Sequence, residues 1–317
     1  MNTILVTGST GFIGRAVVSS LQVNNKIIAS VRSRTDSLPK GVRQVECADL
    51  STAFDWSPVL SEVDVLIHCA ARVHIMNDSA ADSLVEFRKI NTMATMALAR
   101  QAVDFGVKRF VFISSIKVNG EDTNNGTKFL PDDEHVPTDP YALSKYEAEQ
   151  GLLAIARNTA LEVVIIRPPL VYGPGVRGNF SSLIKWINKG VPLPLGSLHN
   201  QRSLVGLDNL VSFIVRCVEH PKAVNKVFLI SDGEDVSTTE LLRKVAKAFG
   251  KQSLLVPVPI PIWLMTLAAK QIGRKDKANK LFGSLQVDNS KTCDLLGWKP
   301  VVTMNEQLKK IADSYFQ

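Results

Sequence analysis

A glycine-rich segment near the start of the chain constrains the fold more than any other feature. Residues 7–14 read TGSTGFIG and follow the apolar run at residues 4–6, which is typical of a buried parallel strand. The helix expected next covers Phe12–Leu21. The glycines are Gly8, Gly11 and Gly14. They let the backbone turn tightly and approach a pyrophosphate at the helix N-terminus, although an ordinary strand–helix loop would also contain such glycines.

Apolar runs and periodic helical segments alternate through the first half of the chain. Several of the runs are continuously apolar, as expected for a parallel sheet that is covered on both faces. The expected strands are Lys26–Val31, Arg43–Glu46, 63–69, 109–115 and Glu162–Arg167, and the clearest helices are 82–105 and Pro140–Asn158. The pattern predicts an α/β fold, a doubly wound Rossmann parallel sheet.

Tyr141 and Lys145 are four residues apart in one of these helices. Pro140 suits its first turn and Asp139 its cap, so the phenol and the ammonium should share one helical face. The cation would favour the phenolate. Lowering a tyrosine pKa from ~10 to roughly 7 requires about 4 kcal/mol. Lysine together with a positively charged nicotinamide ring could supply this, whereas lysine alone hardly could.

Together these motifs resemble the extended short-chain dehydrogenase/reductase family of nucleotide-sugar epimerases, dehydratases and reductases. The resemblance runs from residue 7 to about residue 298. The family's third catalytic residue is a Ser or Thr five positions before a Gly, and in the stretch SSIKVNG this position is Ser115. Asn119 stands where many members have Tyr. The resemblance implies a catalytic set of Ser115, Tyr141 and Lys145.

The resemblance also implies a dinucleotide site, and its further members are Phe12, Ile13, Asp49, Leu50, Cys69, Ala70, Ala71, Asn91 and Pro168. The end of the second strand decides the cofactor, because an acidic residue there would bind the ribose and repel a 2′-phosphate. This chain has Arg32 at that position, followed by Arg34. A guanidinium binds a phosphate in a bidentate manner, so NADP(H) is favoured, and NAD(H) is the alternative.

The substrate implied by the family is a UDP-sugar. Matching substrate contacts are Ser115, Lys117, Asn179, Phe180 and Arg202, and Lys280 is a loose replacement for a late family arginine. The region after residue 169 is rich in glycine and proline, which is typical of substrate-facing loops. We therefore expect a dinucleotide-binding domain at 1–169 with a returning strand and helix near 204–230, and a smaller α/β substrate domain at 170–317.

Two family chemistries do not fit the residues beside Ser115. Dehydratases have an Asp–Glu pair there and epimerase-reductases a Cys, whereas this chain has Ile116 and Lys117. A 4-ketoreductase or a 4-epimerase remains. The segments SSIKVNGE, RPPLVYGPG and PLPLGSLHNQRS resemble surface-polysaccharide (O-antigen, lipopolysaccharide) enzymes that form UDP-N-acetylquinovosamine, which favours the reductase. A non-catalytic dinucleotide-sensing protein is a distant alternative that would be expected to lack the Tyr–Lys pair.

Composition narrows the cellular setting. The four cysteines have no paired or metal-like spacing and the five histidines are scattered, so we expect reduced thiols, no metal site and a cytoplasmic protein without a signal peptide. The net charge is +7, and a basic cluster at 270–280 follows an apolar segment. That cluster could support weak association with a membrane surface. No nucleic-acid module is present, and the family suggests a homodimer.

Overall fold

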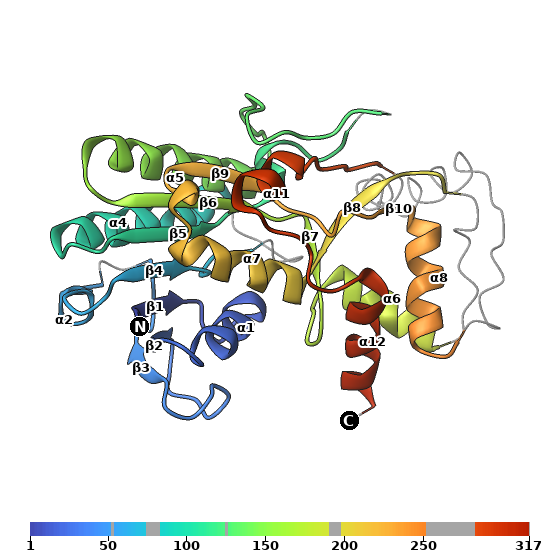
Figure 1. Cartoon of the computed structure of the whole chain (residues 1–317), viewed down its shortest axis with the longest axis horizontal. Helices are drawn as coiled ribbons and strands as arrows, with labels where there is room; N and C mark the ends of the chain where they lie inside the picture. The colour runs from blue at the N-terminus through green and yellow to red at the C-terminus, as the bar shows by residue number, and fades with distance from the viewer. Residues whose placement is uncertain (52–53, 74–82, 124–125, 190–197, 252–282, 317) are drawn as a thin grey trace.

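The computed structural model describes residues 1–51, 54–73, 83–123, 126–189, 198–251 and 283–316. Its main layer is a seven-stranded parallel sheet in the order β3-β2-β1-β4-β5-β6-β9 (Figure 1). The strands are β1 (Thr3–Thr7), β2 (Lys26–Val31), β3 (Arg43–Glu46), β4 (Val65–His68), β5 (Arg109–Ile113), β6 (Glu162–Arg167) and β9 (Lys226–Leu229). The first six strands have the order of a doubly wound dinucleotide fold, which confirms the predicted fold class.

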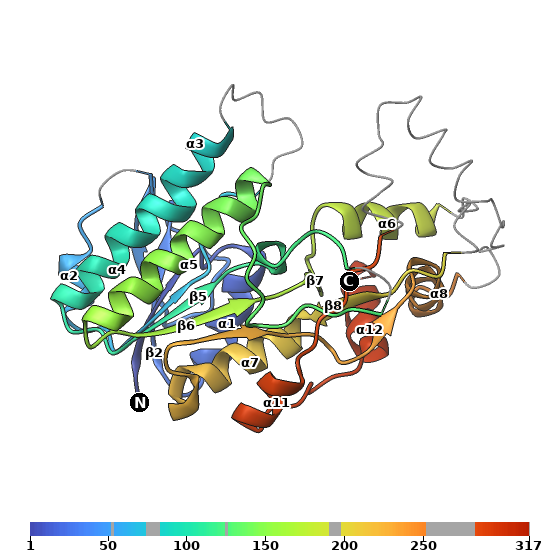
Figure 2. The ribbon, with the colours of Figure 1, turned by 90° about the horizontal axis from the view of Figure 1, so that it is seen from above.

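Helices cover both faces of this sheet (Figure 2). One face carries α1 (Phe12–Leu21), α7 (Leu207–Glu219) and α11 (Ser290–Leu296); the other carries α2 (Ser57–Leu60), α4 (Thr95–Asp104) and α5 (Pro140–Asn158). Strand β1 shows why both faces are apolar: Ile4 and Val6 belong to the core under α1 and α7, whereas Leu5 belongs to the core under α4 and α5. Alternate side chains of one strand therefore support both layers.

A smaller sheet lies beside the main one. It contains β7 (Leu170–Tyr172), β8 (Arg202–Gly206) and β10 (Asp235–Val236), in the order β10-β8-β7. Its apolar core packs against α6 (Asn179–Asn188), α8 (Thr238–Ala248) and α12 (Met304–Tyr315). Within the segment expected near 204–230 to return to the main sheet, β8 instead pairs with β7 and β10 in the smaller sheet. Helix α7 does pack on the main sheet, and β9 is the strand that joins it, by pairing with β6.

The helix expected at 82–105 is also different in detail. Its described part consists of α3 (Ser83–Phe87), a π-helical segment (Arg88–Ala94) and α4. Asn91 lies in this wider turn, and its buried amide accepts a hydrogen bond from Arg72 N at 2.9 Å and donates to Ser144 Oγ at 3.0 Å. A π-helical turn commonly re-aims one side chain at a functional site.

Candidate active site

The glycine-rich turn forms the first wall of the site, where β1 ends and α1 begins. Gly8 has a φ of +65°, and a Cβ built there would lie 2.7 Å from Ala70 N. A Cβ on Gly14 would overlap the Gly8 carbonyl oxygen. Ser9 Oγ donates to Ser30 O at 2.6 Å and so ties the turn to β2. Backbone packing therefore requires glycine at these two predicted positions. Glycines in such a turn are typical of loops that bind a dinucleotide pyrophosphate.

The start of helix α1 supplies donors toward that cradle. Its N-cap is Gly11, whose side chain offers no capping group. Backbone amides of the first turn are then available to an anion. Phe12 and Ile13 are half-buried and pack against the core, so they contribute through their backbone and anchor the turn.

The end of β4 forms the second wall, with Cys69, Ala70 and Ala71. Behind it, the buried ring of His68 has hydroxyls on both sides, with Thr7 Oγ1 at 2.7 Å from Nδ1 and Thr95 Oγ1 at 3.0 Å from Nε2. Thr95 donates to Asn91 O, so Nε2 carries the proton and Nδ1 accepts from Thr7. Burial lowers the pKa of His68 to about 3, which keeps the ring neutral. The small side chains of Cys69, Ala70 and Ala71, with the neutral His68 ring behind them, would allow a cofactor to lie close to the end of β4.

Arg32, Asp49 and Leu50 lie at the far end of the same edge, after β2 and β3. Arg32 is exposed, and its charge helps to hold the pKa of Asp49 below the usual value, although hydrogen bonds from Ser51 contribute more. Arg34 is exposed as well and pairs with Glu46 at 3.1 Å. Arg32 thus lies just after the end of β2, close enough to Asp49 for the two charges to interact.

Ser115, two residues after the end of β5, lies close to Tyr141 at the start of α5. The Ser115 hydroxyl donates a hydrogen bond that lowers the pKa of Tyr141, but burial is the larger effect and raises this pKa to about 12. Phe87 holds the phenol ring edge to face, with 5.8 Å between centroids. In the protein alone, Tyr141 is therefore a phenol, and a further positive charge is needed to favour the phenolate.

Lys145 lies on the same helix and is 1% exposed. Its Nζ donates to Ile113 O at 2.9 Å and lies 4.3 Å from the centroid of the Phe112 ring. Burial lowers the pKa of Lys145 to about 8, and Glu149 opposes this shift. The cap that starts this helix is the predicted one, since Asp139 Oδ1 accepts from Ala142 N at 2.9 Å.

Sequence reasoning missed a buried pair behind these residues. Arg167, at the end of β6, binds the carboxylate of Glu149 through Nε at 3.0 Å and through Nη2 at 2.5 Å. Arg167 Nη1 also donates to Asn119 Oδ1 at 2.9 Å, and Asn119 is the residue that departs from the family pattern. Pro168 follows the pair, and its carbonyl accepts from Ile116 N at 3.0 Å. An arginine directly after the apolar run at residues 163–166 was the available signal.

The residues predicted to contact substrate do not all lie beside the catalytic set in the structure. Lys117 Nζ pairs with Asp139 at 3.4 Å and lies 6.0 Å from the centroid of the Tyr141 ring, so it adjoins the catalytic set. The Phe180 ring is buried against Tyr172, so only its backbone could reach a nucleotide. Asn179 begins α6, and its side chain is not described. Arg202 begins β8 and donates to Gly283 O at 3.1 Å. Lys280 and the cluster at 270–280 lie outside the described residues.

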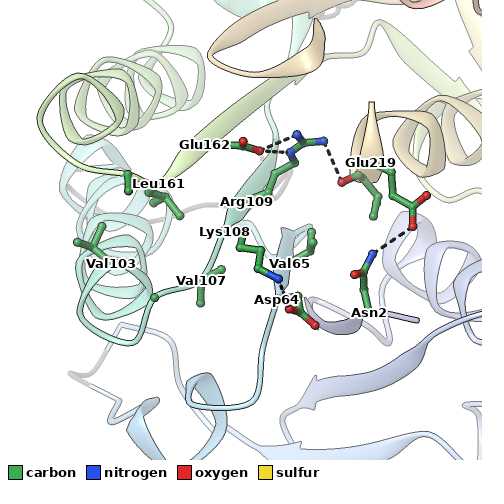
Figure 3. Close-up of a pocket in the computed structure, with 13 residues that line it drawn as sticks. Asn2, Asp64, Val65, Val103, Val107, Lys108, Arg109, Leu161, Glu162 and Glu219 are labelled. Atoms are coloured by element: carbon green, nitrogen blue, oxygen red, sulfur yellow. Dashed lines mark hydrogen bonds and ion pairs between the residues drawn. The ribbon is translucent and has the colours of Figure 1, made fainter. Parts of the chain in front are cut away.

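A hollow of about 530 Å³ lies at the opposite edge of the sheet (Figure 3). Residues at the amino ends of the strands and at nearby helix ends line it, and four of its charged groups form two ion pairs: Lys108 with Asp64 at 2.8 Å, and Arg109 with Glu162 at 2.6 Å. Ligands of open parallel sheets bind at the carboxyl ends of the strands. The hollow is therefore not the active site.

The glycine cradle and the Ser–Tyr–Lys set at one sheet edge define a dinucleotide-dependent enzyme of the short-chain dehydrogenase/reductase class. The chain belongs to the NAD dependent epimerase/dehydratase family, whose model matches residues 4–231. Over the described residues there is no candidate metal cluster of three or more ligating side chains. In the same part of the chain, none of the helices has the length and apolarity needed to cross a membrane.

Curated relatives and solved structures agree with this membership. A UDP-glucose 4-epimerase of Vibrio cholerae is 48% identical over 316 residues, which cover 99% of this chain and 96% of the relative. UDP-glucuronic acid 4-epimerase of Bacillus cereus in complex with NAD superposes with a TM-score of 0.79 at 23% identity, covering 99% of each chain. UDP-N-acetylglucosamine 4-epimerase of Bacillus cereus gives 0.78 at 19% identity, covering 98% of each chain. The two structures support the fold.

Proposed function

We propose that this protein is a UDP-sugar 4-epimerase that acts on a UDP-hexose or a UDP-N-acetylhexosamine. The observation that carries the proposal is that Ser115 lies close enough to Tyr141 to lower its pKa, with buried Lys145 one helical turn after Tyr141, at the sheet edge that also holds the glycine cradle. The full-length similarity to the Vibrio cholerae epimerase supports the choice of reaction. It replaces our sequence-based preference for a 4-ketoreductase as the leading candidate.

The residues of the site divide the work of such a reaction. Gly8, Gly14 and the first turn of α1 would hold the cofactor pyrophosphate, and a bound nicotinamide would supply reversible hydride transfer at C4 of the sugar. Tyr141 Oη takes the proton of the 4-hydroxyl, and Ser115 hydrogen-bonds the same oxygen. The charge on Lys145 favours the phenolate. After the keto sugar presents its other face, Tyr141 returns the proton, and no cofactor is consumed.

A second candidate is the reduction of UDP-4-keto-6-deoxy-N-acetylglucosamine to UDP-N-acetylquinovosamine by NADPH, a reaction of O-antigen synthesis. The exposed guanidinium of Arg32 after β2 favours it, because that position decides whether a 2′-phosphate is accepted. The nearby carboxylate of Asp49 weakens the argument, since it partly balances the charge. The family's description as NAD dependent favours the epimerase.

Product analysis separates the two candidates. Purified protein is offered UDP-glucose and UDP-N-acetylglucosamine with NAD, and separately the 4-keto-6-deoxy sugar nucleotide with NADPH. The products are identified by NMR while the reduced cofactor is followed by absorbance. The epimerase predicts interconversion of C4 epimers without net cofactor change. Oxidation of about one NADPH per keto sugar, with no epimerisation, would instead establish the reductase.

The role of Arg32 has its own test. If its guanidinium binds a 2′-phosphate, Arg32→Asp should weaken NADPH binding by about 2–4 kcal/mol and leave NADH binding largely unchanged. Arg34→Asp is the matched control, because Arg34 is also exposed but already pairs with Glu46. Calorimetric titration of both cofactors measures the effect. Equal losses for NADH and NADPH would mean that Arg32 supports the loop only.

A further inference from the structure

A buried carboxylate behind the catalytic residues has no task in the reaction described above. Glu149 is fully buried on α5, two turns after Tyr141 and one turn after Lys145. Its oxygens accept from Arg167 and from Ser114 Oγ, the latter at 2.5 Å. A buried ion pair is costly to desolvate, so its presence at this position calls for a reason beyond stability.

The Glu149 carboxylate is placed to influence two of the catalytic residues, Ser115 and Lys145. On one side, Ser114 immediately precedes Ser115, and its backbone N–H donates to Ile166 O at 2.8 Å. The hydroxyl of Ser114 is bound by Glu149, so the strand end that carries Ser115 is fixed through both backbone and side chain. On the other side, Lys145 lies one helical turn before Glu149, where an i, i+4 pair shares a face.

Within the described ranges of the chain, few polar groups contact the ammonium of Lys145. Its Nζ contacts one carbonyl oxygen, that of Ile113, and the face of the Phe112 ring. One carbonyl and one ring face compensate only part of the solvation that a buried ammonium loses. A buried cation in such surroundings tends to release its proton unless a carboxylate is near.

The other titratable groups around Lys145 supply less of this effect, since Cys69 also raises the pKa of Lys145 but by less than Glu149 does. At the end of β4, burial keeps His68 neutral by lowering its pKa to about 3 and keeps the Cys69 thiol protonated by raising its pKa to about 12. Tyr141 is a phenol in the protein alone. From β6, Arg167 adds a positive charge, which is paired with Glu149. Among the described groups that act on Lys145, Glu149 supplies the carboxylate.

We propose that Glu149 is a positioning residue that keeps Lys145 protonated while it holds the strand end before Ser115 in place. The inference rests on the proposed function only in the role given to Lys145. The inference predicts the proton affinity of Lys145, which can be measured on the protein without substrate. The inference and the proposed function can therefore fail separately.

The test is an NMR titration of lysine. Protein labelled with ¹³C at lysine Cε is titrated in the absence of sugar, and the Lys145 signal is assigned with Lys145→Arg. In Glu149→Gln the pKa of Lys145 should fall by roughly 1–3 units, as expected when a nearby opposite charge is removed. Glu147→Gln is the matched control, because Glu147 lies on the same helix but forms a partly exposed pair with Arg88. It should leave Lys145 unchanged.

The pH dependence of turnover provides a second measurement. Loss of the carboxylate should move the alkaline limb of the kcat profile to lower pH, because Lys145 then loses its proton at a lower pH, whereas a purely structural defect would lower kcat at every pH.

If Glu149→Gln does not fold, Glu149→Gln with Arg167→Gln removes the pair without leaving an unpaired arginine and should still lower the pKa of Lys145. An unchanged Lys145 pKa in a folded variant overturns the proposal, even if the wild-type protein epimerises UDP-sugars. A lowered pKa in a protein without this activity would leave the inference standing and overturn the proposed function.

Discussion

Two buried arginines at opposite edges of the same sheet show how location decides the use of an ion pair. Arg109 begins β5 and Arg167 ends β6, and each is 6% exposed. The partner of Arg109 is Glu162, whose side chain is 37% exposed, whereas the partner of Arg167 is Glu149, whose side chain is fully buried. The pair at the amino edge faces a hollow that is open to water, and the pair at the carboxyl edge is enclosed beside the catalytic set.

The other hydrogen bonds of Arg109 and Arg167 also differ between the two edges of the sheet. Arg109 Nη1 donates to Cys217 O at 2.8 Å, Val218 O at 2.9 Å and His220 O at 3.2 Å, carbonyls at the end of α7. This arrangement satisfies a helix C-terminus. Arg167 instead orients Asn119, and its partner binds Ser114. The amino edge therefore stabilises the fold, and the carboxyl edge positions reacting groups.

The largest effect expected from this comparison is on turnover at the carboxyl edge. Tyr141→Phe removes the group that moves the proton, and kcat should fall by roughly 10²–10⁴-fold while dinucleotide affinity stays nearly unchanged. Steady-state kinetics and calorimetric titration measure the two quantities. The matched control is Tyr146→Phe on the same helix, which should retain turnover. Wild-type turnover in Tyr141→Phe would remove this residue from the mechanism.

A change at the amino edge should instead affect stability alone. Arg109→Met leaves three carbonyls at the end of α7 without their donor and leaves Glu162 without its partner. Because Glu162 can turn to water, we expect a loss of about 2–3 kcal/mol in the free energy of unfolding, with kcat retained. Urea unfolding and initial rates provide the measurements. A large fall in kcat at unchanged stability would show that the two edges are not separate in function.

The smallest effect concerns Asp64, which lies in the same hollow. Lys108 and the backbone N–H of Thr3 donate to its carboxylate and hold its pKa below the usual value. The group therefore stabilises the fold above the ordinary Asp pKa, near ~4, and this contribution is lost as the pH falls through the lower pKa of the folded state. Asp64→Asn should cost about 0.5–1 kcal/mol at pH 7, because the pair is partly exposed.

The pH dependence of this cost is the measurement that decides it. Urea unfolding of wild type and Asp64→Asn is compared at neutral pH and at steps below pH ~4, where the difference should shrink. Lys108→Met removes the same pair from the other side and should show a similar small cost at neutral pH. A difference that grows with acidity would contradict the assignment of the pKa shift.

Local sequence signals were sufficient to predict the turn after β1 and the start of α5, the elements that would surround the cofactor. The glycine spacing predicted the turn between β1 and α1, because a positive φ at Gly8 and a close approach at Gly14 depend on the residue type itself. Asp139 and Pro140 predicted the start of α5, since capping groups act within one turn. The Tyr–Lys spacing then placed both side chains on one helix. Each of these signals spans fewer than about eight residues.

Tertiary structure decided what depends on contacts between distant segments. The apolar residues of β8 and β9 suit either sheet, and only pairing with β7 or β6 assigns them. Phe180 fits a ligand contact by position, but its ring fills the core against Tyr172. The pairing of Arg167 with Glu149 depends on β6 ending beside α5, across 18 residues of sequence. A buried charge is tolerated only when a partner of opposite charge lies beside it. The folded chain provides that partner for Arg167, and no local sequence pattern does.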